Sequence, residues 1–150
     1  MPHIGYFPVR EYPKPLSIGP PAFVPSQDDH DWIITRTYLN NRTSLDGHSL
    51  YSPVFLPQGA TVTKLKLQGK RNVSGDMLLL NLERVSPDGP TDTMAALVAD
   101  WTGGDGSIET TTITYPTIDN NAYSYVVYTR VDPKEYVLDV QFYRAEITWN

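Results

Sequence analysis

The 150-residue chain contains no cysteine, which excludes disulfides, thiolate metal sites and cysteine nucleophiles and leaves its redox compartment open. Basic residues are also few: 12 Lys and Arg stand against 17 Asp and Glu, a formal net charge of −5. Such a chain lacks the clustered positive charge that non-specific binding to nucleic acid or anionic lipid requires. No apolar run approaches the roughly 20 residues of a membrane span. We therefore expect neither a nucleic-acid nor a membrane partner.

Catalytic signatures are absent as well. A Ser–His–acid triad is not indicated, because none of His3, His30 and His48 accompanies a Gly-x-Ser-x-Gly nucleophile elbow. Most of the carboxylates that a glycosidase would need fall at strand ends or on solvent-facing positions, where charged residues belong anyway. We expect a protein that is not an enzyme and that uses no cofactor.

Two polar loops suggest a ligand but are better explained without one. The cluster at residues 28–31 (DDHD) offers oxygen and nitrogen donors, yet it lacks EF-hand spacing, so a solvated hinge is favoured over a calcium site. Residues 103–106 (GGDG) are glycine-rich like a phosphate loop, but a strand rather than a helix follows them. We expect a hairpin turn there and no metal site in the chain.

From about residue 31 the sequence has the composition and alternation of β-strands. Residues 61–68 (TVTKLKLQ) alternate apolar and polar side chains, and residues 76–85 (DMLLLNLERV) place Leu78, Leu80 and Leu82 on one face. Further strands are expected at residues 31–39, 93–101, 107–115, 123–131 and 136–149. Turn signals rich in Gly, Asn, Asp and Pro separate them. Seven or eight strands at such regular spacing predict an antiparallel sandwich.

The last expected strand, residues 136–149, is long, and its apolar residues occupy both parities. We therefore expect a bulge or bend near residues 139–143. Long bent strands that pass between two sheets are common in jelly rolls. The sequence thus predicts an all-β fold: a single jelly-roll-like antiparallel β-sandwich of about eight strands over residues 28–150.

Seven of the thirteen prolines lie in the first 25 residues, which excludes a helix and favours extended structure there. The same segment is rich in apolar and aromatic residues, unlike a disordered tail. We expect residues 1–27 to form an extended, Pro-rich arm that covers a surface, either of a neighbouring copy or of its own domain. Its candidate docking residues are Ile4, Tyr6, Phe7, Val9 and Tyr12.

Two stretches, residues 51–63 (YSPVFLPQGATVT) and residues 115–125 (YPTIDNNAYSY), resemble a β-sandwich domain of secreted and surface-associated bacterial proteins. The resemblance covers roughly residues 22–149. It implies a jelly-roll-like fold and an extracellular or cell-surface setting, and it transfers no catalytic residue. Joined to an apolar N-terminal arm, the domain is similar to fibre subunits that polymerise by strand donation.

The sequence favours a structural subunit of an extracellular helical fibre, whose arm docks head to tail onto a neighbouring copy. Its partners would then be copies of itself. One alternative is a carbohydrate-binding sandwich in which exposed aromatic side chains stack on sugar rings. The candidates for that role are Tyr123, Tyr125, Tyr128, Tyr136, Tyr143, Trp32, Trp101 and Trp149. The other alternative is a viral capsid decoration or head-fibre protein.

Two N-glycosylation sequons lie between expected strands, Asn41-Arg42-Thr43 and Asn72-Val73-Ser74. Only an exported chain from an organism with the required machinery uses such sites. For an exported chain, Asn41 and Asn72 are the candidate glycan attachment residues.

Overall fold

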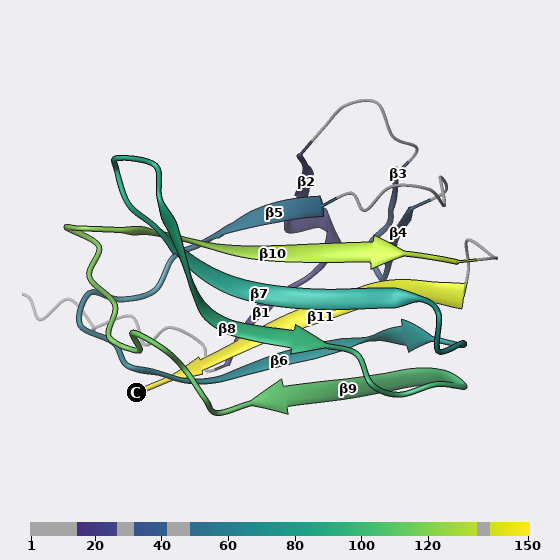
Figure 1. Cartoon of the computed structure of the whole chain (residues 1–150). Coiled ribbons are helices and arrows are strands. Elements are labelled where there is room, and N and C mark those ends of the chain that lie inside the picture. The colour runs from purple at the N-terminus through teal and green to yellow at the C-terminus, as the bar shows by residue number, and fades with distance from the viewer. Residues whose placement is uncertain (1–14, 27–31, 42–48, 135–138) are drawn as a thin grey trace, which may run out of the picture.

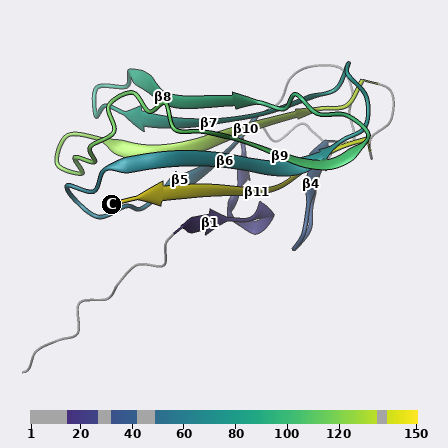
Figure 2. The ribbon, with the colours of Figure 1, turned by 90° about the horizontal axis from the view of Figure 1, so that it is seen from below.

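Two antiparallel sheets packed face to face form the protein, in a computed structural model that describes residues 15–26, 32–41, 49–134 and 139–150 (Figures 1 and 2). The strands are β1 (Leu16–Ile18), β2 (Val24–Pro25), β3 (Trp32–Ile34), β4 (Leu39–Asn41), β5 (Ser49–Val54), β6 (Val62–Arg71), β7 (Met77–Val85), β8 (Thr91–Val98), β9 (Gly104–Thr110), β10 (Ser124–Asp132) and β11 (Val140–Trp149). Sheet A has the order β3–β4–β11–β6–β9, with β1 also paired to β11, and sheet B has the order β2–β5–β10–β7–β8. The predicted jelly-roll-like all-β sandwich is confirmed. Within the described ranges, no helix is long and apolar enough to cross a membrane.

The core lies between the sheets and follows the predicted alternation. On β6, Leu65 and Leu67 face inward and are fully buried. On β7, Leu78, Leu80 and Leu82 do the same from the opposite sheet. Burial of one such side chain contributes about 1.5–3 kcal/mol. Because successive side chains of a strand point to opposite faces, the other half of each strand faces solvent and is available for a binding surface.

Arg71, the last residue of β6, is a buried cation that joins the sheets at one end of the sandwich. Its guanidinium donates from Nε to the Asp76 carbonyl oxygen (2.9 Å) and from Nη2 to the Ser74 carbonyl oxygen (2.7 Å), both between β6 and β7. Its Nη1 donates to the Trp101 carbonyl oxygen (2.6 Å), between β8 and β9. Three oriented acceptors therefore satisfy a charge that is otherwise costly to bury.

The glycine-rich residues 103–106 do not form a hairpin, so that prediction is wrong. β8 pairs with β7 in sheet B, whereas β9 pairs with β6 in sheet A, and the link between them crosses the sandwich. Gly103 and Gly104 have φ angles of 84° and 127°, which residues with a Cβ rarely adopt. A crossing link uses such glycines as readily as a hairpin does, so composition alone does not separate the two.

Residues 16–25, which the sequence assigns to the extended arm, pair with their own domain. β1 pairs with β11 in sheet A and β2 pairs with β5 in sheet B, and the 3₁₀ turn η1 (Pro20–Ala22) connects them. Ile18 and Phe23 are buried, and the Phe23 ring meets the Phe142 ring edge-on at 4.8 Å. This part of the arm docks in cis, the alternative to docking on a neighbouring copy. The expected docking residues Ile4, Tyr6, Phe7, Val9 and Tyr12 lie outside the described residues.

Two features near the N-terminal half differ from the predicted strands. The sequence pattern predicts one strand over residues 31–39, but β3 and β4 pair with each other in a hairpin that turns at residues 35–38. β5 is not among the strands expected from the sequence, and Pro53 lies within it. β2 pairs with only Leu50 and Tyr51, so the Pro53 end of β5 is a sheet edge, where a missing N–H is tolerated.

The predicted bulge in the last strand is confirmed. Tyr143 is the extra residue between the paired positions Phe142–Gly69 and Arg144–Gln68 of β11 and β6. The inward-facing residues are therefore even-numbered before the bulge and odd-numbered after it: Val140, Phe142, Ala145, Ile147 and Trp149. As a result, two consecutive side chains, Tyr143 and Arg144, both lie on the outer face of sheet A.

Candidate functional site

The edge of β11 that faces away from β6 is shared by two short strands, which leaves a seam between them. β1 pairs with residues 145–147 of β11, and β4 pairs with Phe142. Tyr143 and Arg144 lie between these contacts, and no described strand pairs with them on that side. The seam therefore coincides with the bulge, so the sheet opens where two neighbouring side chains both point outward.

A solvent-open groove of about 560 Å³ lies over this seam. We call it the sheet A groove, and its lining residues are Gly19, Pro20, Arg36, Thr37, Tyr38, Gln68, Asp105, Gln141, Tyr143 and Arg144. Its floor comes from β6, β9 and β11, and its walls come from the β1–η1 junction and the β3–β4 turn. Its volume lies within the range of pockets that hold small molecules, and it combines tyrosine rings with polar side chains.

The β3–β4 turn forms one wall, and the Thr35 side chain fixes its shape. The hydroxyl oxygen of Thr35 accepts hydrogen bonds from the backbone N–H of Thr37 (3.2 Å) and of Tyr38 (3.0 Å). The Thr35 N–H donates in turn to the Tyr38 carbonyl oxygen (2.9 Å). A hydroxyl that caps its own turn in this way orders a short connection. The turn can therefore present Arg36 and Tyr38 to the groove in defined positions.

Hydrogen bonds between neighbouring strands hold the side chains of the floor. The Tyr143 hydroxyl of β11 donates to Asp105 Oδ1 of β9 (2.7 Å). The Nε and Nη2 atoms of Arg144 both donate to Gln68 Oε1 of β6 (2.9 and 2.7 Å), and Arg144 Nε also lies 3.4 Å from Glu146 Oε1. Polar groups fixed before a ligand arrives lose little entropy when they bind it.

The Tyr143 hydroxyl is neutral throughout the physiological pH range. Partial burial raises the pKa of Tyr143 to about 12, and the hydrogen bond to the Asp105 carboxylate and its negative charge act in the same direction. The phenol therefore keeps its proton and continues to donate to Asp105. The groove lining holds two guanidinium groups, on Arg36 and Arg144, against the single carboxylate of Asp105.

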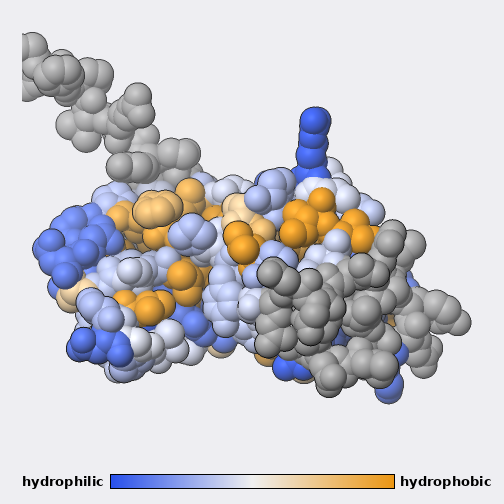
Figure 3. All heavy atoms as spheres, turned by 90° about the horizontal axis from the view of Figure 1, so that it is seen from above, coloured by the Kyte–Doolittle hydropathy of each residue, from blue (hydrophilic) through white to orange (hydrophobic). Residues whose placement is uncertain are grey.

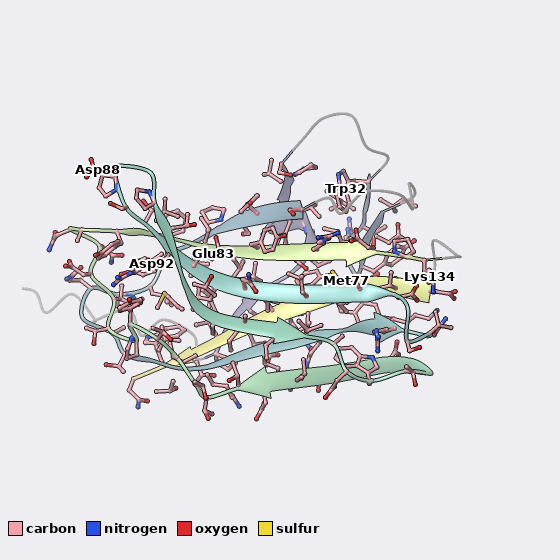
Figure 4. All side chains as sticks on the ribbon, viewed as in Figure 1. Trp32, Met77, Glu83, Asp88, Asp92 and Lys134 are labelled. Atoms are coloured by element: carbon pink, nitrogen blue, oxygen red, sulfur yellow. The ribbon has the colours of Figure 1, made fainter. Side chains whose placement is uncertain are left out.

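The outer face of sheet B has a different character. Val24, Tyr51, Tyr128 and Asn81 follow one another in register across four strands, and the Tyr51 and Tyr128 rings lie 5.2 Å apart. Burial, the Glu83 carboxylate and Tyr128 raise the pKa of Tyr51. We call this surface the sheet B face; Met77 and Glu83 lie along it on β7 (Figure 4). Seen from above Figure 1, the described surface shows its apolar side chains as separate patches among polar ones (Figure 3).

A third aromatic group lies at one end of sheet B and has a structural role. The Arg84 guanidinium lies 3.6 Å from the Tyr115 ring centroid and 4.3 Å from that of Tyr123. The same guanidinium pairs with Asp92 at 2.8 Å, near the β7–β8 hairpin that carries Asp88 (Figure 4). Cation–π contacts of this kind tie the loop before β10 to β7. Tyr123 is therefore already occupied by an intramolecular partner.

The aromatic residues named from the sequence do not gather into one platform among the described residues. Tyr143 lines the sheet A groove, and Tyr128 lies on the sheet B face. Tyr125 is buried, and its hydroxyl accepts the Asp119 N–H (2.8 Å). The tryptophans are taken up by packing: Trp149 is buried, and Trp32 and Trp101 pack half-buried against the core. Tyr136 lies outside the described residues.

Sequence reasoning missed Tyr38, Arg36 and Gln68 as site residues. The pattern over residues 31–39 places Arg36 and Tyr38 in a continuous strand, and only the threonines at positions 35 and 37 signal a turn there. Gln68 was correctly placed on the solvent side of β6, but nothing in its own strand shows that Arg144 faces it. Cross-strand partners are set by register, which a single sequence does not contain.

The two glycosylation candidates occupy different settings. Asn72 follows β6 and is half-buried, and its Nδ2 donates to Asp139 Oδ1 (2.8 Å). A glycan on that nitrogen would have to coexist with this hydrogen bond or replace it. Asn41 ends β4, and the rest of its sequon lies outside the described residues. Use of either site stays a prediction.

Metal ligands do not cluster in the described part of the chain, where no group of three or more His, Asp or Glu side chains is placed to hold an ion. The Asp28–Asp31 cluster and all three histidines lie outside that part, so the predicted solvated hinge remains untested.

No protein-family model matches the chain, and no curated protein matches it in sequence. Among solved structures, it is similar to the C-terminal CBM6 module of LamC, a marine laminarinase from Zobellia galactanivorans. The TM-score is 0.55 at 12% sequence identity, over 89% of this chain and 98% of that chain. This likeness supports the jelly-roll-like sandwich fold.

Two weaker structural matches follow. A xylan-binding CBM22 domain aligns with a TM-score of 0.45 at 10% identity, over 85% of each chain. The enzymatically active domain of tailspike protein 4 from bacteriophage CBA120 aligns with a TM-score of 0.47 at 10% identity. That alignment covers 88% of this chain and 18% of the tailspike chain.

Proposed function

We propose that the chain is a non-catalytic carbohydrate-binding module that holds a saccharide in the sheet A groove. The observation that carries this proposal is the presentation of Tyr38 and Tyr143 together with planar polar side chains in one open groove. A sugar ring has apolar C–H faces and a rim of hydroxyl groups. It therefore binds where aromatic rings and fixed hydrogen-bonding groups meet.

The polar lining residues suit a hydroxyl-rich ligand. Gln141 offers both a donor and an acceptor, and Asp105 offers its second carboxylate oxygen beyond the Oδ1 that accepts from Tyr143. Gln68 offers its amide N–H groups, because its Oε1 already accepts two hydrogen bonds from Arg144. Arg144 is already oriented by Gln68 and Glu146, so it can donate to a ligand without first being ordered. The open shape of the groove accommodates a chain of sugars as well as a single residue.

The likeness of fold adds a smaller measure of support. The structural neighbour with the TM-score of 0.55 is by name a carbohydrate-binding module of a laminarinase. A fold alone does not fix a function, so the groove carries the argument and the neighbour agrees with it. An extracellular or cell-surface setting, which the sequence resemblance implies, belongs to the same proposal.

The fibre-subunit hypothesis has less structural support than carbohydrate binding. Residues 16–25 of its arm pair within the same chain, and its docking residues lie outside the described part. The proposed partner is accordingly a glycan rather than copies of the chain itself.

Affinity electrophoresis and titration calorimetry with a panel of soluble polysaccharides test the proposal. The full-length protein should bind at least one polysaccharide saturably. A double variant, Tyr38→Ala with Tyr143→Ala, should bind about tenfold more weakly or worse, because each aromatic contact contributes about 0.5–1.5 kcal/mol beyond its buried area.

The matched control is Tyr51→Ala with Tyr128→Ala, which removes two tyrosines from the sheet B face and should leave the affinity unchanged. Circular dichroism and urea unfolding establish that both double variants are folded. Loss of binding in the control alone would move the site to the sheet B face. Absence of binding by the unmodified protein to every polysaccharide would contradict the proposed function.

A further inference from the structure

The described outer face of sheet A is basic, although the chain as a whole carries a net charge of −5. Five basic side chains lie on β6, on β11 or in the β3–β4 turn: Arg36, Lys64, Lys66, Lys70 and Arg144. Three acidic side chains accompany them on β9 and β11: Asp105, Glu109 and Glu146. A local excess of one sign raises the concentration of ligands of the opposite sign.

The acidic side chains of this face already have partners. Glu109 lies 3.4 Å from Lys64 Nζ, and Glu146 lies 3.4 Å from Arg144 Nε. Asp105 accepts the Tyr143 hydroxyl. Two carboxylates are therefore each paired with one cation, and Asp105 keeps its charge while it accepts from a neutral phenol, so the five basic side chains still exceed the three acidic ones.

Two guanidinium groups reach the groove from different sides. Arg144 rises from the floor on β11; its Nε and Nη2 are held by Gln68, while its Nη1 has no hydrogen bond within the described residues. Arg36 stands on the exposed β3–β4 turn, and the described residues provide it with no ion pair. Lys70 adds a third cation, in register between the lining residues Gln141 and Asp105.

We infer that the saccharide held in the sheet A groove is acidic, with carboxylate or sulfate groups that Arg36 and Arg144 bind. This inference rests on the proposed function and specifies its ligand class. A planar guanidinium matches the two oxygens of a carboxylate or sulfate and forms charge-assisted hydrogen bonds that are stronger than those to a hydroxyl. The tyrosine rings bind the sugar faces, and the arginines select for the acidic substituent.

Paired polysaccharides that differ only in charge give the sharpest test. Polygalacturonate is compared with its fully methyl-esterified form, alginate with its carboxyl-reduced form, and a sulfated galactan with its desulfated form. At least one acidic member should bind the unmodified protein about tenfold more tightly than its uncharged counterpart, and added salt should reduce that preference. The pairs also separate carboxylate from sulfate as the recognised group.

Variants of the two arginines assign the preference to the groove. Arg36→Gln and Arg144→Gln should each lower affinity for the acidic member about five- to tenfold. Affinity for the neutral member should fall by a smaller factor, because a guanidinium forms a weaker hydrogen bond with a sugar hydroxyl than with a carboxylate or sulfate. Arg144→Lys, which retains the charge but not the planar fork, should recover only part of the loss. The control is Arg130→Gln: Arg130 belongs to sheet B, pairs with Asp132, and should change neither affinity.

The outcomes distinguish the inference from the proposal beneath it. Equal affinity for acidic and neutral members, with loss of binding in the Tyr38/Tyr143 double variant, overturns the acidic ligand and retains carbohydrate binding. The inferred acidic ligand would also be overturned if Arg130→Gln abolished the preference for the acidic polysaccharide while Arg36→Gln and Arg144→Gln did not. Absence of binding to every polysaccharide would contradict both the proposed carbohydrate binding and the inferred acidic ligand.

Discussion

The outer faces of the two sheets share one core and yet differ in almost every other respect. The sheet A face carries Lys64, Lys66, Gln68 and Lys70 along β6, whereas its counterpart on β7 carries Met77, Leu79, Asn81 and Glu83. Both sets alternate with the buried leucines of the same strands. The comparison shows that packing in the core constrains the residue types on the inward face of each strand, whereas the residue types on the outward face vary independently of the core.

The central strands of the two sheets differ in regularity, although sheet B also has one register shift, between Leu82 and Glu83 in the β7–β8 pair. In sheet B, the central strand β10 pairs with β5 and β7 without any shift of register. In sheet A, the central strand β11 has a bulge, and the partner on its outer edge changes from β4 to β1 at the same place. The groove follows from these irregularities, since an unbroken sheet presents a more even surface.

The largest effect is a loss of stability that affects both sheets, and we expect it at Arg71, which joins them. Arg71→Met removes three hydrogen bonds from a buried guanidinium to carbonyl oxygens between β6 and β7 and between β8 and β9. We expect the free energy of unfolding to fall by about 2–4 kcal/mol, because the carbonyl groups lose charged partners. Urea unfolding measures this change.

The neighbouring Lys70→Met is the control for Arg71, because Lys70 faces solvent on the same strand and its removal should change stability by less than about 0.5 kcal/mol. Equal losses in the two variants would show that Arg71 does not join the sheets.

The next effect distinguishes the faces from each other. Tyr143→Ala removes a groove ring and should weaken saccharide binding about tenfold, whereas Tyr128→Ala on the sheet B face should leave it unchanged. Tyr143→Phe keeps the ring but loses the hydrogen bond to Asp105, so we expect a loss of only about twofold to threefold. Calorimetric titration orders the three variants; a Phe variant as weak as the Ala variant would assign binding to the hydroxyl.

A smaller effect is expected at the groove wall. Thr35→Ala removes the acceptor for the Thr37 and Tyr38 N–H groups and should lower stability by about 1 kcal/mol. Because the wall then loses its fixed shape, saccharide affinity should fall a few-fold as well. Thr35→Ser keeps the hydroxyl and should retain most of the stability and of the saccharide affinity. If the Ser variant lost as much of either as the Ala variant, the hydrogen bonds of the Thr35 hydroxyl would be excluded as the cause.

The smallest effect is a pH dependence that comes in part from Tyr143 on the sheet A face; Tyr51 on the sheet B face, whose pKa is also raised, contributes in the same direction. The pKa of Tyr143 is raised from 10.0 to about 12 in the folded protein, so the unfolded chain releases the phenolic proton first. Stability from this source is complete below about pH 10 and declines as the pH rises toward 12. The urea midpoint of Tyr143→Phe should therefore fall less steeply over this range than that of the unmodified protein. Parallel curves for the two proteins would contradict the raised pKa.

Local pattern predicted the fold well and the site poorly. The alternation in β6 and β7 predicts which leucines face the core, and the change of parity in the last strand predicts the bulge at Tyr143. Both are properties of one strand and its two-residue period. The groove, by contrast, brings together residues from the β3–β4 turn, β6, β9 and β11. Their meeting depends on strand order and register, which hydrophobic pattern leaves open.

For the arm, too, the local sequence predicts the conformation of the chain but not its packing partner. The prolines correctly exclude an α-helix over residues 16–25, where the 3₁₀ turn η1 forms instead, but they do not say which surface the extended chain covers. Leu16 and Ile18 pair with β11, and Phe23 packs on Phe142, so that surface is its own domain. Nothing in the local sequence distinguishes a surface of the same copy from that of the next.

Because Tyr143 is a single extra residue in β11, the sheet A groove depends on one insertion in that strand. Deletion of Tyr143 alone would restore regular pairing between β11 and β6 from Val140 to Thr148 and would leave Phe142 and Ala145 directed toward the core, because the inward positions change parity at that residue. Insertion of one residue into a regular strand has the reverse effect. A gene can therefore gain or lose this surface by one in-frame codon while its hydrophobic core stays in place.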